Sequence, residues 1–487
     1  MFDVAVIGAG VSGSSIAHRL SSYSVRVALV DRCADVSFGV SKANSGIIHA
    51  GFHHPAAMLK ARLEVAGNRQ FDALHAELGF PFRRVGIVVA AFSWEEMKSI
   101  DRLYDQGVEN GVPELEIASR ERILFLEPTL SREVVGGLWA PTGGIIEPYR
   151  FVFALAESAI AGGVKLFTEW DLAAARRGED SWQLSSSDGR SIEARWVVNA
   201  AGLDADAVSA LFGAEQFTIR ARKGEEFVLE RGSSGPPRRV IFPVPARTSK
   251  GVLVIPTVEG TVMLGPTAEE VDDKEDTSTT PENLERAFSL ASRMVPRISR
   301  RDIITAFAGL RPTLPGDDFF IEVSGKAPRF VQVAGIQSPG LTAAPAIAER
   351  VKDLLKGDGL ALREKTERRP PLPRTERTRD HASWELDRLV ERDPAYAHIV
   401  CRCEGVSEAE VVEAIRKGHA TLDGIKYYTR AGMGRCQGGF CTYRIMQLVA
   451  RETGLALEAI TKRGRGSELV SGRIGPARSA AAGREGT

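Results

Sequence analysis

Four cysteines near the C-terminus form the clearest metal-binding pattern in this sequence. Cys401 and Cys403 make a C-x-C pair, and after 32 intervening residues Cys436 and Cys441 make a C-x4-C pair. Four thiolates can hold either a tetrahedral zinc ion or an iron–sulfur cluster, so the ligand type alone leaves both open. The fifth cysteine, Cys33, has no partner in this pattern, and we expect it to be a small buried apolar residue.

Three glycines near the N-terminus form a second pattern with chemical meaning. Gly8 permits a tight turn after a β-branched run, Gly10 lets backbone amides approach a pyrophosphate, and Gly13 lets the next helix pack on the sheet. Phosphates then lie at the helix N-terminus, where N–H groups favour negative charge. Asp31 lies 23 positions after Gly8, near the offset of about 20 for an acidic residue that binds the adenosine ribose. The spacing predicts a dinucleotide site, but it does not separate NAD from FAD.

The composition of the chain bounds its size, its partners and its compartment. At 487 residues and 52.7 kDa, two or three domains are expected. Lys and Arg together number 63, as do Asp and Glu, so no overall field favours nucleic acid. The sequence shows no basic leader and no run of about 18 apolar residues, so we expect a cytoplasmic protein without a transmembrane segment. Membrane association through a partner subunit stays open.

The spacing of apolar residues predicts a mixed α/β (α+β) fold. A strand, a helix and a second strand open the chain within about 30 residues. Further along, strand-like runs alternate with helical patterns, and many of the strands are expected to be antiparallel. Strands are predicted at residues 86–91, 164–168, 182–185, 196–201, 226–229, 252–255 and 261–264, and helices at residues 59–78, 151–160, 281–294, 342–355, 406–415 and 442–451.

Four segments of the first 355 residues resemble the D-amino-acid-oxidase-like superfamily of FAD enzymes. In chain order they are residues 41–52 (SKANSGIIHAGF), 197–202 (VVNAAG), 309–312 (GLRP) and 334–342 (AGIQSPGLT). Within that superfamily they resemble the glycerol-3-phosphate dehydrogenase and L-2-hydroxyglutarate dehydrogenase branches. The resemblance implies FAD as the cofactor, in a Rossmann-like FAD-binding domain with an inserted antiparallel-sheet substrate domain.

The resemblance also implies which residues hold FAD. Gly8, Gly10, Gly13 and Asp31 would bind the ADP half, and Asp in place of the longer Glu departs from the family pattern. Where other segments pass the cofactor, small residues let the backbone approach it. A helix start supplies amides to the negative end of the reduced flavin. These further residues are Ser41, Asn44 and Ser45 along the pyrophosphate and flavin, Val164 beside the adenine, Ala201 and Gly202 closing over the cofactor, and Gly335, Gly340, Leu341 and Thr342 beneath the flavin pyrimidine.

Two residues are predicted to act on the substrate. The resemblance places His49 beside the isoalloxazine, and imidazole titrates near working pH, so we expect His49 to be the base for a hydroxyl proton. A structural histidine and a covalent flavin link are the alternatives. Arg311 resembles the arginine that clamps a substrate carboxylate or phosphate, because a guanidinium suits both anions; a surface salt bridge is its alternative role. Lys223 is a candidate second cation.

The C-terminal region resembles the bacterioferritin-associated-ferredoxin-like [2Fe–2S] domain over about residues 399–457. Its most specific stretch is 432–441 (GMGRCQGGFC), and a Ser-capped amphipathic helix is predicted after the first cysteine pair. The resemblance implies that Cys401, Cys403, Cys436 and Cys441 hold a [2Fe–2S] cluster, with zinc as the alternative. The same domain is appended to some glycerol-3-phosphate dehydrogenase large subunits.

The resemblances and the composition together predict the domain boundaries. Residues 1–356 form the FAD-dependent body, whose substrate part spans about 83–145 and 204–310. The segment 357–395 begins with Arg, Lys, Glu, Thr and Pro, which favours an extended linker. Residues 396–460 form the [2Fe–2S] domain. Residues 463–487 are rich in Gly, Arg, Ser and Ala, so we expect them to be disordered.

The leading functional expectation is a dehydrogenase that oxidises a small anionic secondary alcohol with FAD. Glycerol 3-phosphate, giving dihydroxyacetone phosphate, is the first substrate, and electrons pass through the cluster to a second flavoprotein or a quinone-linked acceptor subunit. One alternative keeps the same chemistry and changes the substrate to L-2-hydroxyglutarate, to a different 2-hydroxy acid or to an imino acid. A different class is a non-catalytic electron-relay subunit. A redox-sensing regulator ranks last, since the sequence shows no DNA-reading element.

Overall fold

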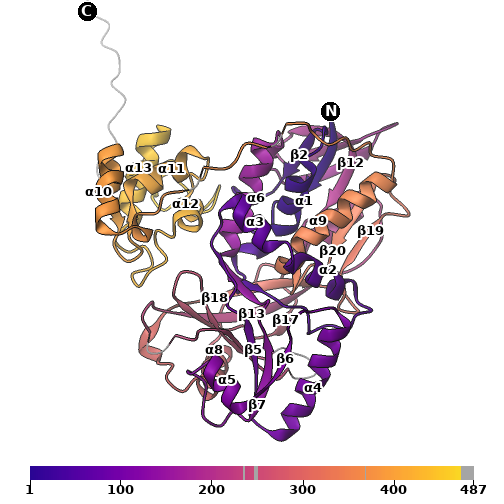
Figure 1. Cartoon of the computed structure of the whole chain (residues 1–487). Coiled ribbons are helices and arrows are strands. Elements are labelled where there is room, and N and C mark those ends of the chain that lie inside the picture. Colours follow the sequence, from indigo (N-terminus) through magenta and orange to yellow (C-terminus); the bar gives the residue numbers. More distant parts are fainter. Residues whose placement is uncertain (234–235, 246–250, 368, 374, 473–487) are drawn as a thin grey trace, which may run out of the picture. The chain divides into compact units, whose positions relative to one another are not determined.

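The computed structural model describes residues 1–233, 236–245, 251–367, 369–373 and 375–472, and its chain divides into two compact units (Figure 1). The larger comprises Met1–Glu376 with Gly432–Gly438, and the smaller comprises Arg377–Ala431 with Gly439–Thr487. The larger unit contains two extended sheets with helices, and the smaller is mainly helical. The predicted α/β (α+β) class is confirmed.

One sheet of the larger unit is built mainly from parallel strands. Its strands and neighbouring helices are β1 Phe2–Ile7, α1 Val11–Leu20, β2 Val27–Val30, α2 Leu59–Asn68, α3 Phe71–Leu78, α6 Pro148–Ala161, β9 Lys165–Phe167, β10 Leu172–Arg177, β11 Trp182–Ser186, β12 Ser191–Asn199, α7 Ala205–Leu211, β19 Phe320–Val323, β20 Phe330–Ala334 and α9 Gly340–Gly357. The parallel strands run in the order β9, β2, β1, β12, β20. Helix α1 packs against α6 and α9, and α2 packs against α9. The central strand β1 is buried, as its continuous apolar run requires.

The other extended sheet is mostly antiparallel and has a core on each face. Its strands are β5 Ile87–Ala91, β6 Glu116–Ser119, β7 Gly136–Ala140, β13 Arg220–Leu229, β14 Val240–Pro243, β15 Leu253–Pro256, β16 Val262–Gly265, β17 Glu269–Val271 and β18 Ile303–Thr313. Alternate residues of β5 enter separate cores, Val88 and Ala90 on one face and Ile87 and Val89 on the other. Helices α5 (Arg120–Leu126) and α8 (Pro281–Met294) cover the first face, and α4 (Trp94–Glu109) covers the second. A short sheet of β3 (Ile47–Ile48), β4 (Phe82–Arg83) and β8 (Gly144–Ile146) completes the unit.

The smaller unit consists of short helices around one small hairpin. Its elements are α10 Ser383–Arg392, β21 Ile399–Cys401, β22 Val406–Ser407, α11 Glu408–Arg416, α12 Leu422–Thr429 and α13 Thr442–Thr453. Helix α11 packs against α12 and α13. Ser407 caps α11 in a capping box, because its Oγ accepts from the N–H of Glu410, whose carboxylate accepts from the N–H of Ser407 at 3.0 Å. The Ser-capped helix predicted here is confirmed.

Three parts of the chain differ from the sequence-based expectation. The helix predicted over 59–78 is two helices, because Asn68 ends α2 and its side-chain amide donates to backbone carbonyls outside the helix. The predicted linker 357–395 contains α10, whose Leu389 packs into a small core with Tyr396 and Ala409. Of the predicted tail, residues 463–472 include a strand bridge from Thr461 to Glu468, and residues 473–487 lie outside the described part.

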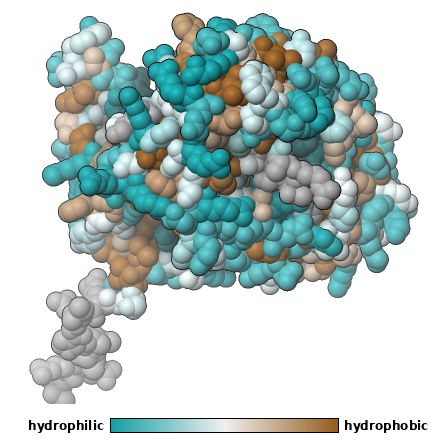
Figure 2. Space-filling view, turned by 90° about the horizontal axis from the view of Figure 1, so that it is seen from below, coloured by the Kyte–Doolittle hydropathy of each residue, from teal (hydrophilic) through white to brown (hydrophobic). Residues whose placement is uncertain are grey.

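The surface of the protein is mixed in polarity, and its helices are short or polar. Figure 2 shows hydrophilic side chains over much of one face, with hydrophobic ones in scattered groups. Within the described ranges, no helix combines the length and apolarity that a membrane crossing needs.

Candidate functional site

The glycines after β1 make backbone contacts that a side chain would prevent. Gly8 has φ +100°, and a Cβ on it would overlap the carbonyl oxygen of Ala200. A Cβ on Gly13 would overlap the carbonyl oxygen of Gly8, so α1 can approach β1 only because this residue is glycine. Gly10 begins α1 without a side-chain cap, which leaves amide groups of the first turn available. This turn therefore fits the pyrophosphate of a dinucleotide.

Asp31 and Ser41 hold the same turn through side-chain hydrogen bonds. Asp31 follows β2, and its carboxylate accepts from the N–H groups of Ala9 at 2.6 Å and Cys33 at 2.8 Å. Burial raises the pKa of Asp31, and the two backbone hydrogen bonds oppose that rise. Ser41 Oγ accepts from the N–H of Val11 at 2.9 Å. Asp31 thus organises the glycine turn, and its contact with a ribose stays a prediction.

Most of the other residues predicted to hold FAD follow the carboxyl ends of parallel strands. Ala201 and Gly202 follow β12, Gly335 follows β20, and Gly340, Leu341 and Thr342 begin α9. Carboxyl ends of parallel strands meet at one edge of a sheet, where nucleotides bind in this type of fold. Asn44 lies in the 41–49 segment, and its side chain accepts from the N–H of Gly46 at 2.9 Å, which shapes the turn before β3.

Val164 is the exception among these predictions. It precedes β9, whereas the register of β9 with β2 places Asp31 at the opposite, carboxyl end of that strand. The structure therefore does not bring Val164 and Asp31 together. Trp170 is nearer, since its N–H donates to the carbonyl of Asp31 at 2.8 Å. The contact of Val164 with the adenine, which the resemblance implies, stays a prediction.

His49 follows β3 and lies against the start of α9. Its N–H donates to Thr342 Oγ1 at 2.9 Å, and its carbonyl accepts from the side-chain amide of Asn68 at 2.6 Å. These bonds fix the backbone, and Nε2 of the ring lies 3.3 Å from Ser338 Oγ. His49 is 8% exposed. The structure thus joins two of the segments predicted to border the flavin, and it adds Ser338 as a contact that the sequence did not single out.

The side chain of Arg311 lies over the glycine pair Gly224 and Gly309 of strands β13 and β18. The register pairs Arg311 with Arg222 and Gly309 with Gly224, so these residues share one face of the sheet. A Cβ on Gly224 would lie 2.7 Å from Nη2 of Arg311, which shows that the guanidinium occupies the space above this glycine. The guanidinium donates to the backbone carbonyls of Arg222 at 3.3 Å, Lys223 at 3.3 Å and Thr267 at 2.7 Å.

Glu226 is the site residue that the sequence analysis missed. It lies two positions beyond Gly224 on the same face of β13, is 3% exposed, and accepts from Ser45 Oγ at 2.7 Å. Burial raises the pKa of Glu226 to about 7, while the hydrogen bond from Ser45 and the charge of Arg311 oppose the rise. The adjacent acidic residues Glu225 and Glu226, directly before the apolar run 227–229, were the available signal.

The charge of Arg311 is also affected by this environment. Burial lowers the pKa of Arg311 to about 10, with the carboxyl of Glu226 opposing the shift. The residue is therefore still a cation at neutral pH. Lys223, predicted as a second cation, lies on the other face of β13, where its Nζ contacts Asp276 at 2.7 Å. That prediction is wrong, because the alternation of the strand places Arg222 rather than Lys223 on the face of Arg311.

The cysteines of the C-terminal pattern lie in loops and at the ends of short elements. Cys401 ends β21, Cys403 follows in a turn and Cys441 precedes α13, while Cys436 lies in the segment Gly432–Gly438 that groups with the larger unit. Across the described ranges, no three or more His, Cys, Asp or Glu side chains are arranged to hold a metal ion. The donor chemistry fits an iron–sulfur cluster, since four cysteine thiolates are its usual ligands.

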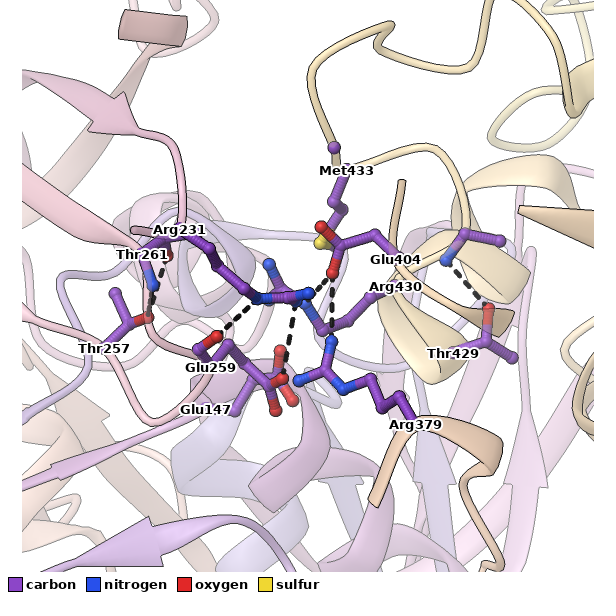
Figure 3. A network of polar contacts seen from close by, with 12 residues as sticks. Glu147, Arg231, Thr257, Glu259, Thr261, Arg379, Glu404, Thr429, Arg430 and Met433 are labelled. Carbon is purple, nitrogen blue, oxygen red and sulfur yellow. Dashed lines mark hydrogen bonds and ion pairs between the residues drawn. The ribbon is translucent and has the colours of Figure 1, made fainter. Parts of the chain in front are cut away.

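A buried ion-pair cluster adjoins the first cysteine pair. Glu404 directly follows Cys403, and its Oε2 accepts from Arg430 Nε at 2.8 Å and from Arg379 Nη1 at 3.1 Å (Figure 3). Glu404 and Arg430 are both buried. The cluster therefore ties the C-x-C loop to the end of α12 within the smaller unit.

The fold and the site define a class, the two-domain flavoprotein oxidoreductases with a Rossmann-like nucleotide sheet and an antiparallel substrate sheet. Comparison with known families agrees, since FAD dependent oxidoreductases match residues 3–354 and the BFD-like [2Fe-2S] binding domain matches residues 399–451. The chain belongs to the FAD dependent oxidoreductase family and carries a BFD-like [2Fe-2S] binding domain. The resemblances stated from the sequence, and FAD and [2Fe–2S] as the cofactors, are thereby confirmed.

Individual proteins within this family are similar to the chain to different extents. A protein of Caloramator mitchellensis named glycerol 3-phosphate dehydrogenase is 41% identical over 474 residues, covering 97% of this chain and 98% of that protein. The FAD-bound structure of L-alpha-glycerophosphate oxidase from Mycoplasma pneumoniae is 30% identical with a TM-score of 0.72, covering 75% of this chain and 97% of the oxidase. A mitochondrial L-2-hydroxyglutarate dehydrogenase of Arabidopsis thaliana is 27% identical, covering 72% of this chain and 82% of that protein.

Proposed function

We propose that this protein oxidises glycerol 3-phosphate to dihydroxyacetone phosphate with FAD and passes the electrons through a [2Fe–2S] cluster to an acceptor. The observation that carries the proposal is the 41% identity to the Caloramator dehydrogenase, which extends over both domains. The Mycoplasma oxidase matches over 97% of its own length but only 75% of this chain. Because the additional region includes an iron–sulfur domain, it offers electrons an exit other than oxygen, and this favours a dehydrogenase over an oxidase.

The roles of the substrate residues follow from their chemistry. The guanidinium of Arg311 binds the anionic end of the substrate, because its hydrogen bonds to carbonyls fix its position and it stays charged. His49 takes the hydroxyl proton, with its ring placed against Ser338 and its backbone held by Thr342. A bound flavin supplies the hydride acceptor. The low exposure of His49 excludes most water from the proton that it takes.

The cofactor residues are proposed on the same basis. Gly8, Gly10 and Gly13, with Asp31 and Ser41, bind the ADP half of FAD. The flavin is bordered by Ser45, Ala201, Gly202 and the start of α9, because nucleotides bind at the carboxyl edge of a parallel sheet. The four cysteines of the C-terminal pattern ligate the cluster. The acceptor is a second flavoprotein or a quinone-linked subunit, and the compartment is the cytoplasm.

Anaerobic reduction of the flavin tests the substrate. Mixing the purified protein with glycerol 3-phosphate without oxygen should bleach the flavin absorbance, and an iron–sulfur signal should appear in the electron paramagnetic resonance spectrum. Arg311→Met should raise KM about 100-fold, the effect of losing a charge-assisted pair. Arg220→Met is the matched control, because this arginine lies on β13, the strand paired with that of Arg311, but its side chain is exposed. Bleaching by another substrate and not by glycerol 3-phosphate rejects the assignment.

A second candidate is a 2-hydroxy acid dehydrogenase. The similarity to the Arabidopsis L-2-hydroxyglutarate dehydrogenase favours it, and Arg311 suits a carboxylate as well as a phosphate. A panel of glycerol 3-phosphate, L-2-hydroxyglutarate and an imino acid, each offered anaerobically, separates the candidates by rate of bleaching. If His49→Asn and Arg311→Met leave the turnover of a complete complex unchanged, the protein is instead an electron-relay subunit.

A further inference from the structure

We propose that Glu226 is a positioning residue that sets how strongly Arg311 binds an anion, with the protonated carboxyl permitting binding and the ionised carboxylate weakening it. The proposal rests on the proposed role of Arg311 as the anion-binding residue. It adds a residue to the substrate site that the sequence motifs do not contain, and it predicts a specific dependence of affinity on pH.

The backbone of the β13–β18 pair brings the two side chains together. Arg222, Gly224 and Glu226 are alternate residues of β13, so they follow one another along one face of the sheet. Arg311 begins opposite Arg222 and extends over Gly224, which has no side chain to block it. Its guanidinium therefore lies beside Glu226, the next residue on that face.

A second segment closes over this face. A Cβ on Gly309, the partner of Gly224 in the register, would overlap the carbonyl oxygen of Ala43, so the backbone at Ala43 lies directly on the sheet here. Two residues further on, Ser45 donates to Glu226 Oε1 at 2.7 Å. The resemblance to flavoproteins placed this segment along the flavin, so Glu226 lies between a cofactor-binding segment and the anion-binding arginine.

The two protonation states of Glu226 act differently on Arg311. A neutral carboxyl leaves the positive charge of Arg311 uncompensated, so an incoming anion receives the whole attraction. An ionised carboxylate next to the guanidinium compensates that charge and repels the anion. Because burial raises the pKa of Glu226 to about 7, the change falls in the range in which enzymes work. At Glu226 Oε2 the described residues provide no hydrogen-bond partner, so the ionised form is poorly stabilised.

Other charged groups lie near the pair of Glu226 and Arg311. Arg222 lies on the same face and lowers the pKa of Arg311 by repulsion, but it also faces Glu270 at 3.5 Å and Asp317 at 3.8 Å. From β16, Gly265 contacts Glu226 and carries no charge. His49, four positions beyond Ser45, is a second ionisable group of the site. The test therefore has to separate Glu226 from His49.

Binding of inorganic sulfate to the holoenzyme provides that test, because sulfate keeps the same charge throughout the range used. Sulfate affinity would be measured from the perturbation of the flavin spectrum and from competition with substrate, between pH 6 and pH 8.5. In the wild-type protein the affinity should fall about tenfold as pH rises, the effect of one nearby charge. In Glu226→Gln, which keeps the shape and the Ser45 contact but cannot ionise, the affinity should stay near the wild-type value at pH 6.

The same measurement has outcomes that overturn the proposal. If the affinity of Glu226→Gln falls with pH in parallel with the wild-type protein, His49 or another group causes the change and Glu226 does not. Should Glu226→Gln fail to retain FAD, Ser45→Ala serves instead, since losing this hydrogen bond raises the pKa of Glu226 and should move the midpoint of the wild-type curve to higher pH. An unmoved midpoint counts against the proposal.

The proposed function and this inference can fail separately. If glycerol 3-phosphate does not reduce the flavin but sulfate affinity depends on Glu226, the substrate is wrong and the anion site stands. If the substrate is oxidised but Arg311→Met leaves sulfate affinity unchanged, the inference fails and the activity stands.

Discussion

In the larger unit, residues that are far apart in the sequence meet at the site, whereas in the smaller unit the polar contacts join nearer neighbours. Ser45 and Glu226 are separated by 181 positions, and His49 and Thr342 by 293. In the smaller unit Glu410 bonds to Ser407 three positions away, and Glu404 to Arg430 26 positions away. The larger site therefore exists only once its two sheets have folded, while the smaller unit is specified by local signals.

The two units should therefore differ in how far the effect of a substitution extends. A change in the backbone of the larger unit displaces residues that come from several elements at once, because strands and loops are packed without spare room at Gly8, Gly13 and Gly309. A change in the smaller unit should stay local, since its contacts span short separations.

Gly13→Val should abolish FAD binding. A side chain here would overlap the carbonyl oxygen of Gly8, so α1 would have to leave β1 and its amides would no longer face the pyrophosphate. We expect purified protein without flavin absorbance but with its iron content retained. Gly39→Ala is the matched control, because a Cβ at Gly39 meets no atom within 4 Å. Normal flavin content in Gly13→Val contradicts the role given to this glycine.

Cys441→Ser should remove the cluster and leave the flavin chemistry intact. A serine hydroxyl is a poor ligand for iron in place of a thiolate, so the iron content should fall to the level of the apoprotein. Glycerol 3-phosphate should still bleach the flavin anaerobically, while electron transfer to an external acceptor is lost. Cys33→Ser is the control. Burial raises the pKa of Cys33 to about 12, so its thiol stays protonated and is no ligand. Loss of iron from Cys33→Ser counts against the assigned ligand set.

Local signals explain what the sequence could predict. The glycine turn, the four cysteines and helix α8 depend on residue types at fixed short spacings, and α8 has the predicted bounds Pro281–Met294 because Thr280 caps it and Pro281 starts it. The cap at Ser407 was recognisable for the same reason. These features need no knowledge of how distant segments pair.

The positions of Glu226, Lys223 and Val164 could not be predicted in this way. Which residues of β13 share a face with Arg311 depends on the register with β18, and a shift of one residue exchanges Lys223 with Arg222. Val164 depends on which end of β9 meets β2. The periodicity of one strand does not determine its register with another strand. The residues that form the site could therefore be identified only from the paired sheet.

Stability should depend on pH through Glu226. Its pKa is raised from 4.5 to about 7 in the folded protein, so the folded state holds a proton that the unfolded state has released. Stability therefore falls as pH rises from about 4.5 to about 7, by up to about 3 kcal/mol. Glu226→Gln lacks this loss, and its Tm at pH 8 should exceed the wild-type value by roughly 5 °C. The Tm of the wild-type protein and of Glu226→Gln is measured by flavin fluorescence during heating at pH 5 and pH 8.

Comparing the two pH values within each protein cancels the direct effect of the substitution. A wild-type Tm that falls between pH 5 and pH 8 by the same amount as that of Glu226→Gln would show that another group causes the pH dependence. In that case the burial of Glu226 has no energetic consequence for the larger unit.

The smallest effect should come from single helix caps, one in each unit. Ser407→Ala removes the side-chain cap of α11 and should cost the smaller unit about 1 kcal/mol. Ser93→Ala removes the equivalent cap of α4, where Ser93 Oγ accepts from the N–H of Glu96 at 3.1 Å, and should cost the larger unit a similar amount. Release of flavin on heating reports the larger unit, and release of iron to a chelator reports mainly the smaller unit, which supplies three of the four cysteines. If short-range contacts confine changes to the smaller unit, Ser407→Ala accelerates iron release and leaves flavin release unchanged, and Ser93→Ala does the reverse. Equal effects of either variant on both releases would mean that the units unfold together, and the contrast between long-range and local construction would then have no consequence for stability.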